Sequence, residues 1–244
     1  MSTGSGVVDY WLGKQSEHAF LEEVHGESAI EWVKKRNESC IGAIGEPSES
    51  PMYGKVLSIL DSKDKIPHVR KIGDHFYNFW QDAANKRGLW RRTSMESYAS
   101  GSTEWETVLD VDALCAEEGE SWVWKGQVLH RPLDDSSPSR TLLKLSRGGS
   151  DAVVLREFDI ASRRFVAPDA DERGFVVEEA KSSVSWLTRD TLLVGTDMKD
   201  GASMTDSGYP RVVRVWQRGT PIADSLVMYE GEVKDVAVSG YTVS

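Results

Sequence analysis

The stretch KLSRGGSDAVVLREFD, residues 144–159, decides between two kinds of structure. A glycine loop that binds phosphate is followed by a helix, whose free N-terminal N–H groups hold the anion. Here two adjacent valines begin a short apolar run interrupted by charge, which is typical of a strand, and LLKL before the glycines also favours a strand. Gly148 and Gly149 are therefore predicted to supply the positive φ of a hairpin turn and to bind nothing.

Short strands of this kind recur from Ile66 onward, in groups of four separated by Gly, Asp, Asn and Ser. The first group is HVRKIG, HFYNFWQD, GLWRRTS and EWETVLDV; the second is SWVWKG, TLLKLS, AVVLREFD and SRRFVAP; the third is KSSVSWLT, TLLVGTDM, PRVVRVWQR and DSLVMYEG; and VKDVAVSGYTVS begins a fourth. Trp90, Leu155 and Val213 each fall in the third strand of their group. Repeated four-stranded units predict a mainly β fold of propeller blades, whereas a sandwich does not predict this grouping.

The first 65 residues are predicted to be helical and to form a segment separate from the blades of residues 66–244. Gly26 is expected to separate a short first turn from a longer helix. One face of that helix carries Ala29, Trp32, Val33, Cys40 and Ile44. A second helix is predicted to begin at Pro51, a favoured first-turn residue, and to turn four side chains inward: Met52, Val56, Ile59 and Leu60. Because propellers have four to eight blades, three blades and the start of a fourth indicate a chain that is cut short.

Composition excludes several classes of partner. The 244 residues carry a net charge of -10 with a pI near 5.1, which argues against a nucleic-acid partner. No apolar stretch approaches the roughly 18 residues that span a bilayer, so no membrane partner is expected. The N-terminus lacks the features of an export signal, which favours the cytoplasm. Cys40 and Cys115 lack metal-ligand spacing and are predicted to be free thiols.

The sequence supplies no catalytic, cofactor-binding or metal-binding residue. Ser203 lacks the G-x-S-x-G context of a nucleophile elbow and is predicted to lie in a loop. The histidines lack metal-ligand spacing: His18, His25, His68, His75 and His130. The acidic pairs are interpreted as solvated charge: Glu22-Glu23, Glu117-Glu118, Asp134-Asp135 and Glu178-Glu179. Seven strand tryptophans are predicted to fill the core rather than to stack on a ligand: Trp80, Trp90, Trp105, Trp122, Trp124, Trp186 and Trp216.

The ordered series of segments resembles the N-terminal part of the prolyl oligopeptidase family of serine peptidases. Trp32, Val33 and Asn37 resemble that family's N-terminal W-V…N helix, and HFYNFWQDAANKRGLWRR resembles its first-blade pattern. Three further segments resemble its successive blades: KLSRGGSDAVVLREFDIASRRFV, KSSVSWLTRDTLLVGTDM and SGYPRVVRVWQRGT. The resemblance covers nearly the whole chain in order.

This resemblance implies a cytoplasmic endopeptidase in which a propeller restricts an α/β-hydrolase domain to short peptide substrates. The helical segment would pack on that hydrolase domain, its intramolecular partner. The Ser-Asp-His triad of the family matches no residue here, so the hydrolase domain is expected to be absent and the chain alone inactive, with no cofactor. Two alternatives stay open: a free-standing propeller-like binding protein, and a propeller glycosidase with carboxylates around its channel.

Overall fold

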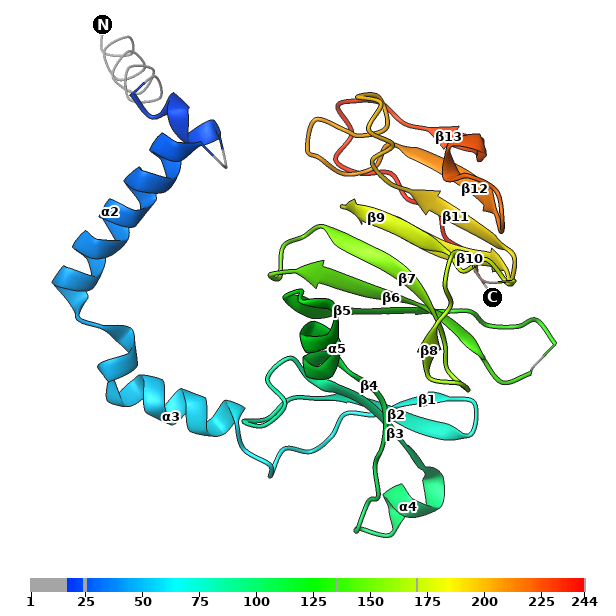
Figure 1. Cartoon of the computed structure of the whole chain (residues 1–244), viewed down its shortest axis with the longest axis horizontal. Coiled ribbons are helices and arrows are strands. Elements are labelled where there is room, and N and C mark those ends of the chain that lie inside the picture. Colours follow the sequence, from blue (N-terminus) through cyan, green and yellow to red (C-terminus); the bar gives the residue numbers. More distant parts are fainter. Residues whose placement is uncertain (1–16, 24–25, 135, 170, 244) are drawn as a thin grey trace, which may run out of the picture. The chain divides into compact units, whose positions relative to one another are not determined.

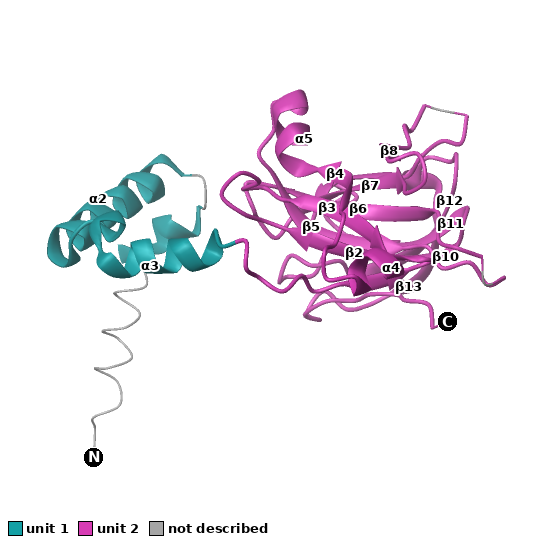
Figure 2. Ribbon diagram, turned by 90° about the horizontal axis from the view of Figure 1, so that it is seen from below, with its two compact units in different colours: residues 1–62 teal, residues 63–244 magenta. Residues whose placement is uncertain are grey.

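The computed structural model describes residues 17–23, 26–134, 136–169 and 171–243. The chain divides into two compact units, residues 1–62 and residues 63–244, which are coloured separately in Figure 2. The first unit is helical, and the second unit carries all of the strands within the described residues.

The helical unit contains two helices, α2 (Glu27–Ile44) and α3 (Pro51–Leu60), and two short 3₁₀ turns, η1 (Ala19–Glu22) and η2 (Pro47–Glu49). Gly26 has an extended backbone and is the N-cap of α2. The Ser50 hydroxyl accepts a hydrogen bond from the Met52 N–H at 3.2 Å, which caps α3 just before Pro51. Both predicted helices, the separating glycine and the first-turn proline are thus confirmed.

The predicted inward face of α3 is wrong within this unit. Met52, which was expected to point inward, is 65% exposed, and Val56, Ile59 and Leu60 are also exposed. On the apolar face of α2 only Ala29 is buried, and Ile44 is 73% exposed. Helical spacing places apolar side chains on one face but does not supply the element that covers it. The described residues of this unit provide no such cover.

The second unit is built from three antiparallel sheets, which follow one another in Figure 1 from cyan through green to orange. The first sheet has the order β1 (Arg70–Ile72), β2 (His75–Trp80), β3 (Leu89–Ser94), β4 (Glu106–Asp110). The second contains β5 (Trp122–Leu129), β6 (Arg140–Arg147), β7 (Val153–Asp159), β8 (Arg164–Phe165) and β9 (Val176–Ala180). The third has the order β10 (Ser183–Thr188), β11 (Thr191–Gly195), β12 (Val212–Gln217), β13 (Leu226–Glu230). A short 3₁₀ turn, η3 (Ile222–Asp224), precedes β13.

Sequential hairpins in three sheets confirm the mainly β fold, and the first and third sheets have the four strands predicted for them, whereas the second has five. Trp90, Leu155 and Val213 lie in the third strands of their sheets, as predicted. Two short helices were not predicted. The helix α4 (Met95–Ala99) lies between β3 and β4, and α5 (Val111–Glu118) follows β4. They are too brief for a helical period to be recognised.

Two strand predictions need correction. SRRFVAP contributes only the two residues of β8, and most of the outer pairing to β7 comes instead from β9, which was not predicted. Leu155 on β7 pairs with Val177 on β9. The segment around Val177 becomes a strand because the edge of β7 is available to pair with it. The segment expected to begin a fourth group, residues 233–243, contains no strand within its described part.

The stretch of residues 144–159 is a hairpin between β6 and β7. Gly148 has φ +63° and Gly149 has φ +91°, so both occupy the region that favours glycine. The strand β7, not a helix, follows the turn. The predicted turn is confirmed, and no helix N-terminus is present here to hold a phosphate.

The hydrophobic core lies between successive sheets, and the second sheet is covered on both faces. Neighbouring leucines of β6 point to opposite faces: Leu142 packs toward Trp186 and Trp216 of the third sheet, while Leu143 packs toward Trp90 of the first sheet. This arrangement explains why the adjacent Leu142 and Leu143 are both fully buried, since a strand buried on both faces has no solvent side. Stacked sheets of this kind form the radial core of a propeller.

Candidate functional site

A groove of about 940 Å³ follows the first strands of the sheets. Its lining comes from Arg70 on β1, from residues 127–134 at the end of β5, from residues 185–189 on β10, and from residues 241–243. Because each of these strands is the first of its sheet, the groove runs along one edge of the stacked blades. We refer to it as the first-strand groove.

A bulge positions the β5 wall of the groove. The pairing of β5 with β6 shifts register between Trp124 and Gln127, where Gly126 has φ +106°. A bulge bends the strand and changes the direction of the side chains that follow it. Gln127 and Val128 therefore enter the groove beyond the bend.

Hydrogen bonds hold the walls of the groove together. The indole N–H of Trp186 on β10 donates to the Val128 carbonyl oxygen on β5 at 2.9 Å. The Thr242 hydroxyl donates to the Trp186 carbonyl oxygen at 3.0 Å, and the Thr242 N–H donates to the Ser185 hydroxyl at 3.2 Å. Three segments far apart in the sequence are thereby fixed as one surface.

The electrostatics of the groove differ from those of the chain. Arg70, Arg131 and Arg189 line it, whereas Asp134 is the only carboxylate among its described lining residues. His130 is buried and packs edge-on against Trp186, with ring centroids 5.2 Å apart. Burial and, to a smaller extent, the nearby Arg189 lower the pKa of His130. The groove thus carries net positive charge in a protein of net charge -10.

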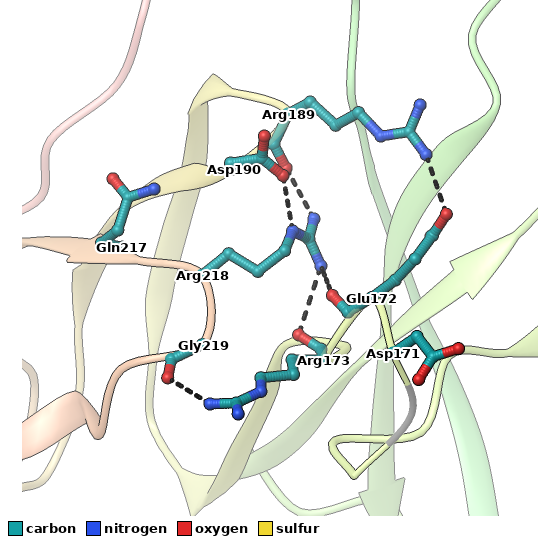
Figure 3. Close-up of a pocket in the computed structure, with 8 residues that line it drawn as sticks. All are labelled: Asp171, Glu172, Arg173, Arg189, Asp190, Gln217, Arg218 and Gly219. Atoms are coloured by element: carbon teal, nitrogen blue, oxygen red, sulfur yellow. Dashed lines mark hydrogen bonds and ion pairs between the residues drawn. The ribbon is translucent and has the colours of Figure 1, made fainter.

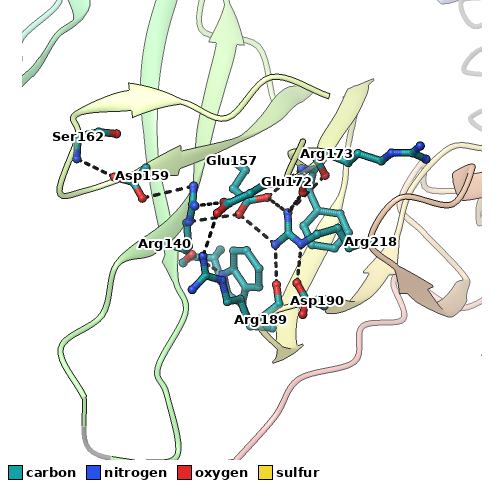
Figure 4. A network of polar contacts seen from close by, with 12 residues as sticks. Arg140, Glu157, Asp159, Ser162, Glu172, Arg173, Arg189, Asp190 and Arg218 are labelled. Carbon is teal, nitrogen blue, oxygen red and sulfur yellow. Dashed lines mark hydrogen bonds and ion pairs between the residues drawn. The ribbon is translucent and has the colours of Figure 1, made fainter. Parts of the chain in front are cut away.

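Beside the groove, a network of ion pairs joins the second sheet to the third (Figure 4). Glu157 on β7 is fully buried and accepts two hydrogen bonds from the Arg218 guanidinium, at 2.7 and 3.1 Å. It also accepts the Phe175 N–H at 2.9 Å. Burial alone would lower the pKa of Arg218, but hydrogen bonds to Glu157 and Asp190 raise it above its ordinary value. Arg218 therefore stays charged at any physiological pH.

A cavity of about 530 Å³ opens next to this network (Figure 3). Figure 3 shows Arg218 in its centre, between Asp190 and the loop that carries Glu172 and Arg173. Arg173 is itself bound to the Gly219 carbonyl oxygen at 3.0 Å, and Arg189 contacts Glu172 at 3.5 Å. Opposite charges here are paired with each other, so the cavity is a poorer candidate for a binding site than the groove.

Ser203 lies in a loop, as predicted. Its side chain is buried, and the Met198 N–H donates to its hydroxyl at 2.9 Å, while its own N–H donates to Asp200 at 2.9 Å. These bonds tighten the β11–β12 connection. The hydroxyl is used structurally and does not meet a general base in that network.

The histidines, acidic pairs and cysteines considered in the sequence can now be placed in the structure. Across the described residues no group of three or more His, Cys, Asp or Glu side chains could hold a metal ion. His68 is exposed, and His75 is half-buried at the start of β2; His25 and Asp135 lie outside the described residues. Of the acidic pairs, Glu118 is held in place because it accepts the Trp122 indole N–H at 2.7 Å and binds Arg156. Both cysteines are free thiols.

Four of the seven strand tryptophans are buried in the cores between sheets: Trp90, Trp122, Trp186 and Trp216. Trp80 and Trp105 are half-buried and enclose the Arg91 guanidinium, whose carbon lies 4.2 Å from each ring centroid. Core packing is thus confirmed for most of these residues. The groove and the ion network were not predicted, although Glu157 shares a strand face with Leu155, and a carboxylate in an apolar register is a signal of a buried ion pair.

Comparison with known proteins agrees with this architecture. Residues 16–244 match the model of the prolyl oligopeptidase N-terminal β-propeller domain. The chain belongs to the prolyl oligopeptidase family. The family resemblance and the propeller fold predicted from the sequence are confirmed, and the family is one of serine peptidases.

Bacterial relatives are longer than this chain. An uncharacterized peptidase of Sinorhizobium fredii is 39% identical over 97% of this chain and 32% of its own length. An uncharacterized peptidase of Rickettsia prowazekii is 29% identical over 91% of this chain and 31% of its own length. The chain therefore spans about a third of the curated relatives it matches.

Solved structures show the same relationship. A post-proline cleaving enzyme from Rickettsia typhi superposes with a TM-score of 0.79 at 28% identity, over 94% of this chain and 33% of that one. Oligopeptidase B from Leishmania major has a TM-score of 0.59 at 12% identity, over 86% of this chain and 27% of that one, a likeness of fold alone.

Proposed function

We propose that this chain is the N-terminal part of a cytoplasmic serine endopeptidase that hydrolyses short peptides, with the propeller sheets gating access. Family membership supports the peptidase chemistry, in which an activated serine is acylated and then released by water. The triad that performs it would lie in an α/β-hydrolase domain outside these residues. The chain by itself is then inactive and needs no cofactor.

The single observation that carries the gating role is the first-strand groove. It is lined by the first strands of all three sheets, its walls are joined by the bonds between Trp186, Val128 and Thr242, and it is large enough for a segment of extended peptide. A folded protein would not enter such a groove, whereas a flexible peptide would. This geometry supports gating by size.

The helical unit is proposed to cover the hydrolase domain. The apolar faces of α2 and α3 are exposed within their own unit, including Ile44, Met52 and Ile59. Exposed apolar surface of this extent marks an interaction site. Its proposed partner is intramolecular.

The test of peptidase function uses the full-length protein that carries this chain at its N-terminus. A fluorogenic peptide with proline before the scissile bond should be hydrolysed, and a serine-directed inhibitor should abolish the activity. A matched peptide with a basic residue at that position measures specificity. Turnover by residues 1–244 alone, or full-length activity that resists the inhibitor, would contradict the proposal.

Gating is tested separately by reversible labelling. Leu133 is 92% exposed and lines the groove, so Leu133→Cys in a Cys40→Ser background accepts a bulky methanethiosulfonate reagent there. The label should slow hydrolysis of the reporter peptide, and a reductant that releases it should restore the rate. Glu117→Cys, on the exposed side of α5, is the matched control. Equal rates for labelled and unlabelled Leu133→Cys would exclude passage along this groove.

A further inference from the structure

The first-strand groove has a charge that its proposed role in peptide entry does not require. The chain has 29 basic and 39 acidic residues, yet three arginines and one aspartate line the groove. A concave surface of one sign focuses its field and raises the local concentration of ligands of the opposite sign. The groove therefore favours negatively charged ligands although the protein as a whole repels them.

Its arginines are available to a ligand to different degrees. Arg70 and Arg131 are exposed and have no ion pair within the part of the chain that the structure describes. Arg189 meets Glu172 at 3.5 Å, which is longer than the 2.7–2.9 Å typical of a strong charge-assisted bond, and Glu172 is shared with Arg140. Both partners of that contact are about half exposed, so water and a ligand carboxylate compete for it.

The carboxylate of the groove already accepts hydrogen bonds from its own loop. Asp134 accepts hydrogen bonds from the hydroxyl and the backbone N–H of Ser136, at 2.7 and 3.2 Å, and the hydroxyl bond in particular lowers its pKa. It is held toward its own loop by these bonds. Guanidinium groups form paired hydrogen bonds with carboxylates, which makes the arginines suited to a carboxylate ligand.

We propose that the first-strand groove selects peptides that present a carboxylate, either an acidic side chain or a free C-terminus, through Arg131 and Arg189 with support from Arg70. This inference rests on the proposed role of the groove in admitting peptides. The apolar side chain of Leu133, which is 92% exposed, contacts the rest of the peptide. Selection occurs at the groove and is independent of which bond is later cleaved.

The test measures binding to residues 1–244 by fluorescence anisotropy, with four labelled peptides of one length. An amidated peptide with asparagine is the neutral reference; the second has aspartate in place of asparagine, the third has a free C-terminus, and the fourth has lysine. The aspartate or the free-carboxylate peptide, or both, should bind more tightly than the neutral one, and the lysine peptide more weakly. Added salt should reduce the differences, since the screening length is about 10 Å at 0.1 M.

Charge-removing variants locate the effect. Arg131→Gln and Arg189→Gln should each weaken binding of the carboxylate peptides about two- to fivefold, the range for exposed ion pairs, and leave the neutral peptide unchanged. Arg164→Gln, an exposed residue of β8 outside the groove, makes the same change in net charge and should have no effect. Circular dichroism confirms that each variant is folded.

Several outcomes would overturn the inference: no binding of any peptide, equal binding of neutral and carboxylate peptides, or an equal effect of Arg164→Gln. None of them depends on turnover. If the full-length protein fails to hydrolyse peptides while this chain still selects carboxylates, the proposed function fails and the groove assignment stands. If the full-length protein hydrolyses peptides but this chain does not select carboxylates, the proposed function stands and the groove assignment fails.

Discussion

Glu157 and Arg218 form a buried, two-point ion pair between the second and third sheets, with hydrogen bonds of 2.7 and 3.1 Å. Glu157 is fully buried, and the Arg218 side chain is 13% exposed. Arg218 also donates to Asp190 at 2.7 Å and to the Arg189 carbonyl oxygen at 2.6 Å, at the margin of the first-strand groove. The pair thus connects the packing of the sheets to the shape of the groove.

Glu157→Gln should destabilise the chain by up to about 3–5 kcal/mol, because it removes the buried carboxylate and leaves the Arg218 guanidinium with only the exposed Asp190 as its charge partner. Urea unfolding followed by tryptophan fluorescence measures this. Replacing both residues with Met should restore part of the loss, since an apolar pair of similar volume leaves no buried charge. The exposed pair of Glu120 with Arg147 is the control, and Glu120→Gln should cost no more than about 1 kcal/mol. A similar cost for both single variants would contradict the special role of Glu157.

Asp82 should contribute stability that is lost only in strong acid. The Trp80 indole N–H and the Asn85 backbone N–H donate to its carboxylate, and they lower its pKa from 3.8 to about 2. A lowered pKa in the folded state stabilises the fold above the unfolded value, and this contribution disappears as the pH falls from about 4 to about 2.

Asp82→Asn should therefore lower the free energy of unfolding by about 1–2 kcal/mol near neutral pH, and the difference from the parent should shrink as the pH falls from about 4 through the folded pKa of about 2. Urea titrations at several pH values measure the difference. Asp151→Asn, at an exposed turn, is the matched control. A difference that does not change with pH would show that Asp82 acts through shape and not through charge.

His130 should make the chain less stable as the pH falls through the ordinary range of histidine. Burial lowers its pKa, so the folded state disfavours the charged imidazole while the unfolded state accepts it near pH 6.5. The stabilising contribution is present above that range and is lost as the pH falls toward the folded value.

His130→Gln should reduce the loss of stability between about pH 7.5 and about pH 5.5. Thermal unfolding at the two pH values, compared with His68→Gln at an exposed site, measures this. The comparison is made in one buffer of constant ionic strength, because Arg189 and Asp190 also act on this imidazole. An identical pH dependence in parent and variant would exclude His130 as the titrating group.

The turn glycines should tolerate only residues that accept positive φ. Gly148 has φ +63° and open space where a Cβ would stand, so strain and not a clash decides the outcome. Gly148→Val should cost about 1–2 kcal/mol, and Gly148→Asn clearly less, because asparagine visits the left-handed region more readily. Chemical denaturation of the two variants provides the test. Equal costs would indicate that the turn changes its conformation on substitution.

The hairpin at Gly148 and Gly149, the grouping of strands and the family could be predicted from the sequence, because turn chemistry and alternation are local properties of the chain. The sequence did not determine that β9 pairs with β7, or that the apolar faces of α2 and α3 lack cover in their own unit. Those features depend on which edges and faces meet. The same holds for the ion pair of Glu157 with Arg218 and for the arginines of the first-strand groove. Stacking of the sheets brings these side chains together, and no spacing in the sequence relates them.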